Sequence, residues 1–238
     1  MKPHIIYESG YPLHGELLVH YTKAKRSIAR HFVKGIGSGL IAISIMGLVA
    51  IYGPVLQQEI LYETGHSTLE TINYVDIAEA NDIEAIQKES QEYGVNSHFS
   101  VVIPKIGASA DILANIDTSD PQKYNQALMK GIAHAKGTYF PGQDNNVYLF
   151  AHSTNSSLHV ARYNAEFYLL NKLEEGDQII VYFSDERYIY TVTGSHIIDP
   201  DDTSWLQQSD TERLTLQTCY PPGTTLQRLI VTAKPAQS

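Results

Sequence analysis

The single cysteine of the chain lies where a nucleophile could be placed. Cys219 ends the run 213–219 (RLTLQTC), whose residues alternate as in a β-strand, and prolines stop the strand shortly after it. A thiolate attacks acyl carbonyls, but an ordinary thiol needs a nearby base or cation to form one at neutral pH. A buried and inert thiol is an equally good interpretation of the residue alone, because free cysteines are among the most buried residues.

Two further residues could supply the base and the cation. His152 directly follows the apolar run 147–151, so it lies at a strand end, as Cys219 does. Arg228 lies among leucine and isoleucine residues in the run 226–231, where a guanidinium is costly to bury unless it meets an anion or an acyl oxygen. His152 and His159 are seven residues apart, but no cysteine or acidic cluster completes a metal site with them. We therefore predict no metal ligands.

The elements that must position these residues are mostly short strands. Turn signals containing Pro, Gly or Asp separate many of the strand-like runs, which favours a mainly β fold, a closed barrel with short inserted helices. The strand-like runs cover residues 98–107, 111–116, 147–152, 178–183, 188–192, 214–219 and 226–233, and helical patterns cover 121–130 and 162–173.

Charge divides the chain unevenly. The net charge of -9 is the sum of a basic segment, residues 1–34, with six Lys or Arg and two acids, and an acidic remainder. Residues 35–56 carry no charge and are long enough for one membrane span, and the basic residues before them place the N-terminus in the cytoplasm. We expect a cytoplasmic tail (1–34), a transmembrane helix (35–56), an extracellular spacer (57–97) and a catalytic domain (98–238). The acidic balance argues against nucleic acid as a partner, and one cysteine excludes an internal disulfide framework.

At these residues the chain resembles the sortases, membrane-anchored cysteine transpeptidases of Gram-positive-type cell surfaces. The sequence TLQTC at 215–219, Arg228 nine residues later and the strand-end His152 match the signature of that family. The runs 100–112 and 136–153 resemble the first core strand and the approach to the family's histidine. One departure is Ala151, where the family usually has glycine before the histidine. The likeness covers roughly residues 98–234.

The resemblance implies a mechanism. Cys219 would attack the Thr–Gly bond of an LPxTG-like sorting motif to form a thioester, His152 would act as general acid and then base, and Arg228 would stabilise the oxyanion. The implied partners are secreted proteins with a C-terminal sorting motif, an amine acceptor such as a cell-wall precursor or a pilin lysine, and the lipid bilayer. The expected lining of the substrate groove is Thr215, Leu216 and Thr218, with strand packing as the other interpretation.

Two points stay open at this stage. The turn with Asp199, Asp201 and Asp202 corresponds to a loop near which some sortases bind calcium, so calcium is an optional ligand and no cofactor is required. The alternatives to a sortase are a cell-wall L,D-transpeptidase, which has a different motif before its cysteine, and a membrane-tethered β-domain that binds a surface polymer or a partner without catalysis.

Overall fold

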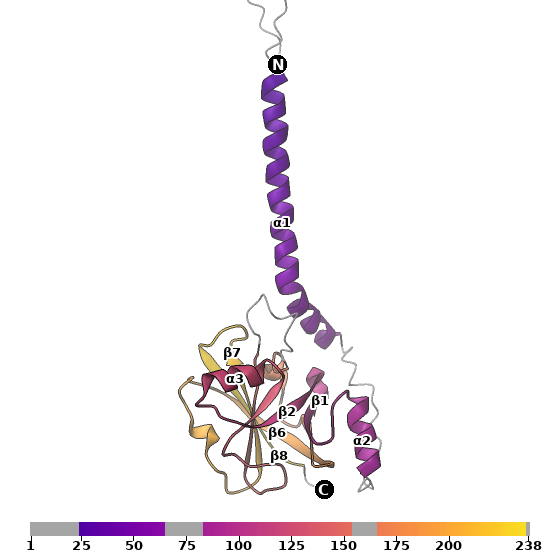
Figure 1. Cartoon of the computed structure of the whole chain (residues 1–238), viewed down its shortest axis with the longest axis vertical. Helices are drawn as coiled ribbons and strands as arrows, with labels where there is room; N and C mark the ends of the chain where they lie inside the picture. The colour runs from indigo at the N-terminus through magenta and orange to yellow at the C-terminus, as the bar shows by residue number, and fades with distance from the viewer. Residues whose placement is uncertain (1–23, 65–82, 154–165, 237–238) are drawn as a thin grey trace, which may run out of the picture. The chain divides into compact units, whose positions relative to one another are not determined.

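The computed structural model describes residues 24–64, 83–153 and 166–236 (Figure 1). Predictions for the other residues, among them His66, His159 and the first part of the helix expected at 162–173, lie outside the described residues. The helical elements are α1 (Ala24–Glu63), α2 (Ile83–Glu92), η1 (Pro104–Ile106), α3 (Pro121–Leu128), η2 (Leu170–Lys172) and η3 (Ser204–Leu206). The strands are β1 (Phe99–Ile103), β2 (Ala108–Ile116), β3 (Ile132–Ala135), β4 (Asn146–Phe150), β5 (Gln178–Phe183), β6 (Glu186–Ile198), β7 (Arg213–Tyr220) and β8 (Gln227–Pro235).

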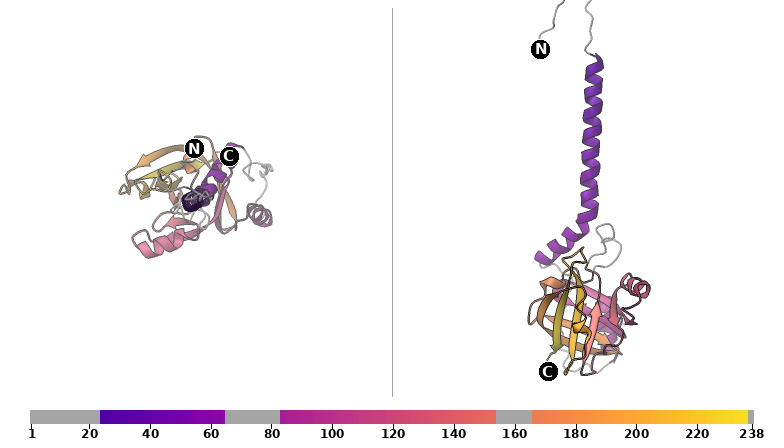
Figure 2. Two further views of the ribbon diagram at one scale, coloured as in Figure 1. Left: turned by 90° about the horizontal axis from the view of Figure 1, so that it is seen from above. Right: turned by 90° about the vertical axis from the view of Figure 1, so that its left-hand side faces the viewer.

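The strands close into one barrel in the order β1-β2-β3-β4-β7-β8-β6-β5, with β5 returning to β1. The β2–β3 and β4–β7 pairs are parallel and the others are antiparallel. Figure 2 shows the strands wrapping around a common centre. The prediction of a closed β-barrel with short inserted helices is confirmed.

Alternation along the strands separates two faces. In β7, Leu214 and Leu216 point into the barrel core, whereas Thr215, Gln217 and Cys219 take the alternate positions on the outer face. The outer face of β3 and β4 is itself covered, because Tyr148 and Phe150 pack in a second apolar cluster with Ala127 and Leu128 of α3. On the outer face of β4 and β7, the aromatic residues Tyr148 and Phe150 therefore lie beside Thr215, Gln217 and Cys219.

Three local predictions are corrected by the structure. Residues 104–106 form the 3-10 turn η1 instead of continuing the strand, since Pro104 lacks a backbone N–H for the ladder. Residues 166–173 form turns and η2 instead of a helix, because Phe167 and Leu170 are both drawn fully into the barrel core. Strand β3 was not expected at all, since its four residues are too short to show a period.

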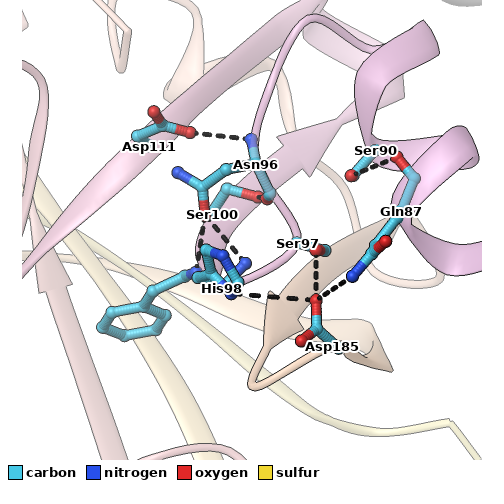
Figure 3. A network of polar contacts seen from close by, with 9 residues as sticks. Gln87, Ser90, Asn96, Ser97, His98, Ser100, Asp111 and Asp185 are labelled. Atoms are coloured by element: carbon cyan, nitrogen blue, oxygen red, sulfur yellow. Dashed lines mark hydrogen bonds and ion pairs between the residues drawn. The ribbon is translucent and has the colours of Figure 1, made fainter. Parts of the chain in front are cut away.

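The expected spacer also contains folded structure. Ile86 of α2 and Tyr93 and Val95 after it pack against Val102, Ile180 and Tyr182 of the barrel. Asp185 in the β5–β6 turn accepts hydrogen bonds from the Ser97 hydroxyl and, at 3.2 Å, from the Gln87 amide of α2 (Figure 3). Residues 83–97 therefore belong with the barrel and not with a loose stalk.

Helix α1 includes the uncharged stretch 35–56, so the prediction that this stretch is helical is confirmed. Within the residues that the structure describes, no helix is long and apolar enough to cross a membrane. The prediction of a membrane span over 35–56 is therefore not confirmed.

His134 of β3 is fully buried and held as a neutral imidazole. Its Nδ1 accepts the Asn115 backbone N–H at 3.3 Å, so the ring proton lies on Nε2, which is 2.9 Å from the Tyr139 carbonyl oxygen. Burial lowers the pKa of His134 below its ordinary value of 6.5. Protonating Nδ1 would also remove the acceptor for Asn115.

This arrangement predicts a loss of stability in mild acid. Below about pH 6.5 the unfolded chain protonates its histidines, whereas folded His134 takes up its proton only at a lower pH, so the unfolded state binds more protons. The free energy of unfolding should thus decrease as the pH is lowered, by at most about 1.4 kcal/mol per pH unit for one such group. Urea unfolding at about pH 7.5 and about pH 5.5, one unit either side of the ordinary histidine pKa, measures the change in the free energy of unfolding. A His134→Gln variant should show a smaller decrease, and equal pH dependence in the two proteins would contradict the assignment.

Candidate active site

Strands β4, β7 and β8 bring the ends that carry Cys219, His152 and Arg228 together. Cys219 and Arg228 are directly opposite each other in the antiparallel β7–β8 pair, so both side chains leave the same face. In the parallel β4–β7 pair, Phe150 is opposite Gln217, and the Ala151 N–H donates to the Gln217 carbonyl at 3.1 Å. Continuing this register by two residues puts His152 beside Cys219.

Cys219 is a free thiol at the end of β7 and is half-buried. Its neighbour Thr218 is buried, and the Thr218 hydroxyl donates to the Ala151 carbonyl at 3.0 Å. This bond joins the side chain of the residue before the thiol to the backbone of the residue before His152. The relative position of the two strand ends is thus fixed by the barrel and not by the site side chains.

His152 lies two residues beyond the end of β4 and is half-buried. Burial lowers the pKa of His152 below 6.5, so the imidazole is mainly neutral at neutral pH. A neutral imidazole can take a proton from a neighbouring thiol. Once charged in this partly buried position, it gives the proton up readily.

Arg228, near the start of β8, is anchored by carbonyl oxygens of residues just before it in the chain. Its Nη1 donates to the carbonyls of Gln227 at 3.1 Å and Thr225 at 3.3 Å. Both bonds use Nη1, and no described residue hydrogen-bonds to Nε or Nη2. The Nε and Nη2 edge is a planar fork that can bind a carboxylate or an acyl oxygen.

The residues expected to line a substrate groove are packed away from solvent. Leu216 is a fully buried part of the barrel core, and the Thr218 hydroxyl already donates to the Ala151 carbonyl. Thr215 lies on the outer face but is 0% exposed, and its hydroxyl donates to Asn146 at 2.8 Å. The groove-lining role of these three residues finds no support, and their burial agrees with strand packing.

Other residues occupy the outer face instead. The Tyr148 hydroxyl donates to the Gln217 side-chain oxygen, and Phe150 stacks on Tyr124 of α3 with ring centroids 5.2 Å apart. Period-two alternation from His152 and Cys219 would have found Tyr148, Phe150 and Gln217 in the sequence. No signal in the sequence indicates Tyr124, because its place depends on how α3 packs.

The acidic turn after β6 shows local hydrogen bonds. Asp202 accepts the backbone N–H of Ser204 at 2.9 Å, and its own N–H donates to the Asp199 carbonyl. Across the described ranges of the chain, no group of three or more His, Cys, Asp or Glu side chains is arranged to hold a metal ion.

Comparison with known proteins agrees with this geometry. The model of the sortase domain family matches residues 101–236, which is more than half of the chain and runs from within β1 to the end of the barrel. Sortase D of Bacillus subtilis is 32% identical over 120 residues, which are 50% of this chain and 52% of that protein. The match therefore spans only about half of the Bacillus relative.

Two further likenesses extend over more of the chain. Sortase A of Listeria monocytogenes is 25% identical over 206 residues, which cover 80% of this chain and 86% of that protein. The crystal structure of sortase C-1 from Actinomyces oris superposes with a TM-score of 0.51 at 25% identity, over 77% of this chain and 99% of that one. The matches carry different class letters, so they assign no subclass.

The family match separates this chain from an L,D-transpeptidase, because a sortase model matches it from within β1 to the end of β8. With a cysteine and an arginine paired across β7 and β8 and a histidine at the neighbouring strand end, the chain belongs to the sortase family of cysteine transpeptidases.

Proposed function

We propose that this sortase cleaves an LPxTG-like sorting motif and transfers the acyl part to an amine at the cell surface. The observation that carries the proposal is the cross-strand pair of Cys219 and Arg228 on the outer face, with His152 at the adjoining end of β4. That pair puts a nucleophile beside a fixed positive charge, which is what acyl transfer through an oxyanion requires.

In the proposed mechanism, His152 takes the thiol proton of Cys219, and the thiolate adds to the carbonyl carbon of the Thr–Gly bond. The resulting oxyanion is held by the free edge of the Arg228 guanidinium. The C–N bond then breaks, and the imidazolium protonates the departing amine, which leaves a thioester on Cys219. The lowered pKa of His152 favours this last proton transfer.

An incoming amine completes the transfer. His152, neutral again, takes a proton from the amine as it attacks the thioester, and the thiolate of Cys219 leaves. Water in place of the amine gives hydrolysis. A cell-wall precursor or a pilin lysine is the proposed acceptor, and secreted proteins with the motif are the proposed donors. The proposed reaction needs no cofactor, because the three side chains supply the nucleophile, the acid–base group and the positive charge.

The test is a peptide assay on the full chain purified in detergent. An LPxTG-containing peptide should be cleaved between Thr and Gly, and added oligoglycine should convert the product to the amide adduct. Parallel reactions with calcium and with a chelator show whether the acidic turn contributes. Lack of cleavage across a library that varies each motif position would refute the proposal.

We also propose that the chain is attached to the cell membrane with the barrel outside. Part of α1 exposes large apolar side chains, as suits contact with lipid; they include Leu40, Ile41, Ile43, Ile45, Met46, Leu48 and Val49. The six basic residues among 1–34 favour a cytoplasmic N-terminus.

Cell fractionation and surface proteolysis test this placement. The chain should sediment with membranes and resist extraction by high salt, and protease added to intact cells should remove the barrel while sparing an N-terminal tag. Recovery in the soluble fraction, or protection of the barrel, would contradict the placement.

A further inference from the structure

Tyr124 of α3 stands over the outer face of the barrel. Its ring lies parallel to that of Phe150, with an interplanar angle of 9° and 5.2 Å between centroids, and it packs at the edge of the apolar cluster beneath α3. Asp120 caps the start of α3 by accepting the N–H groups of Gln122 and Lys123, so the turn that carries Tyr124 is fixed. The ring is only half-buried, so one side faces away from this cluster.

The stack on Phe150 places this ring next to the reactive residues. Phe150 is the register partner of Gln217, and two residues further along the two parallel strands come His152 and Cys219, on the same face. Tyr124 also interacts electrostatically with the site: burial raises its pKa, the negative charge of Cys219 raises it further, and the positive charge of Arg228 opposes the rise. The phenol is thus a neutral donor close to both groups.

The neighbouring tyrosine shows what is special about Tyr124. The Tyr148 hydroxyl donates to the side-chain oxygen of Gln217, so the Tyr148 hydroxyl already has its acceptor within the chain. For the Tyr124 hydroxyl, in contrast, no hydrogen-bond acceptor is found in the part of the chain that the structure describes. A neutral hydroxyl that is partly desolvated gains from an acceptor brought by a ligand.

We propose that Tyr124 is a substrate-contacting residue, whose hydroxyl donates a hydrogen bond to an oxygen on the acyl half of the sorting motif when the peptide lies against Cys219. This rests on the proposed function, since it requires a peptide whose carbonyl is attacked by the thiol. The ring of Phe150 sets the height of the phenol above the strands, and α3 forms one wall of the peptide site.

A Tyr124→Phe variant tests the contact, because it removes one oxygen and keeps the stack on Phe150. KM for the motif peptide should rise about 3- to 10-fold, the loss expected for one hydrogen bond, with kcat within about twofold of wild type. The peptide dissociation constant should rise by the same factor when Cys219→Ala is compared with the Cys219→Ala/Tyr124→Phe double variant, in which no turnover interferes.

Tyr188→Phe is the matched control. It removes a phenol hydroxyl from β6, where the hydroxyl donates to Glu186, and leaves the outer face of β4 and β7 untouched. Its KM should equal that of wild type. An unchanged KM and dissociation constant in Tyr124→Phe, or an equal change in Tyr188→Phe, would overturn this inference while the wild type still cleaves the peptide. Failure of the wild type to cleave any motif peptide would instead count against the proposed function.

Discussion

Replacing Cys219 with alanine should abolish both cleavage of the motif peptide and formation of the amide adduct. The thioester forms on this sulfur, and no other residue of the chain is a thiol. By comparison with the removal of nucleophiles from other acyl-transfer enzymes, the rate should fall by a factor on the order of 10⁴ to 10⁶. The measurement is product formation under single-turnover conditions, followed by mass spectrometry.

The single cysteine makes the control unambiguous. Iodoacetamide should inactivate the wild type in proportion to the alkylation of one site, and the motif peptide should protect that site. Because Cys219 is only half-buried, Cys219→Ala should keep a melting temperature close to that of the wild type. Cleavage that persists in the folded variant would show that another group is the nucleophile.

Replacing Arg228 with lysine should lower kcat about 10²- to 10³-fold, although the charge is conserved. The guanidinium donates through Nη1 to two loop carbonyls and still presents a second edge to an acyl oxygen. An ammonium is a single point of charge, so it cannot keep the loop contacts and reach the oxyanion in the same geometry. Steady-state kinetics with the motif peptide measure the loss.

Arg187→Lys is the comparison for this variant. Arg187 is another arginine of the barrel, paired with Glu89 of α2 at 3.4 Å on β6, away from the β7–β8 pair that carries Cys219 and Arg228. It should retain kcat within about twofold, with any effect confined to stability. Retention of near-normal kcat by Arg228→Lys, or an equal loss in Arg187→Lys, would remove Arg228 from the proposed mechanism.

Much of the barrel could be predicted because the information is local. The alternating residues 214–219 and the short apolar run 178–183 both indicate strands, and the structure contains β7 and β5 at those places. The elements that were missed lack such a signal. Strand β3 has four residues, and residues 166–173 are held in turns by burial in the core and not by their own helical pattern.

The residues expected to line the substrate groove show that the pattern of a single strand does not determine which side chains face the site. The sortase resemblance implies a groove lined by Thr215, Leu216 and Thr218 because they share a strand with Cys219, yet adjacent strand residues face opposite sides. Leu216 therefore enters the core, and the hydroxyls of Thr215 and Thr218 are used within the β4–β7 pair. The side chains that share the outer face with Cys219 include Thr215, Gln217 and Arg228, together with Tyr148 and Phe150 of β4.

The identities of the reactive groups were set by the linear pattern: a single thiol at a strand end in TLQTC, an arginine nine residues later and a histidine after an apolar run. Their meeting was decided by the tertiary structure, because His152 reaches Cys219 only through the parallel pairing of β4 with β7, across 67 residues of chain. The position of Tyr124 over that pair depends on the packing of α3. A strand pattern specifies which face is buried, whereas strand partners and helix placement depend on contacts between segments far apart in the chain.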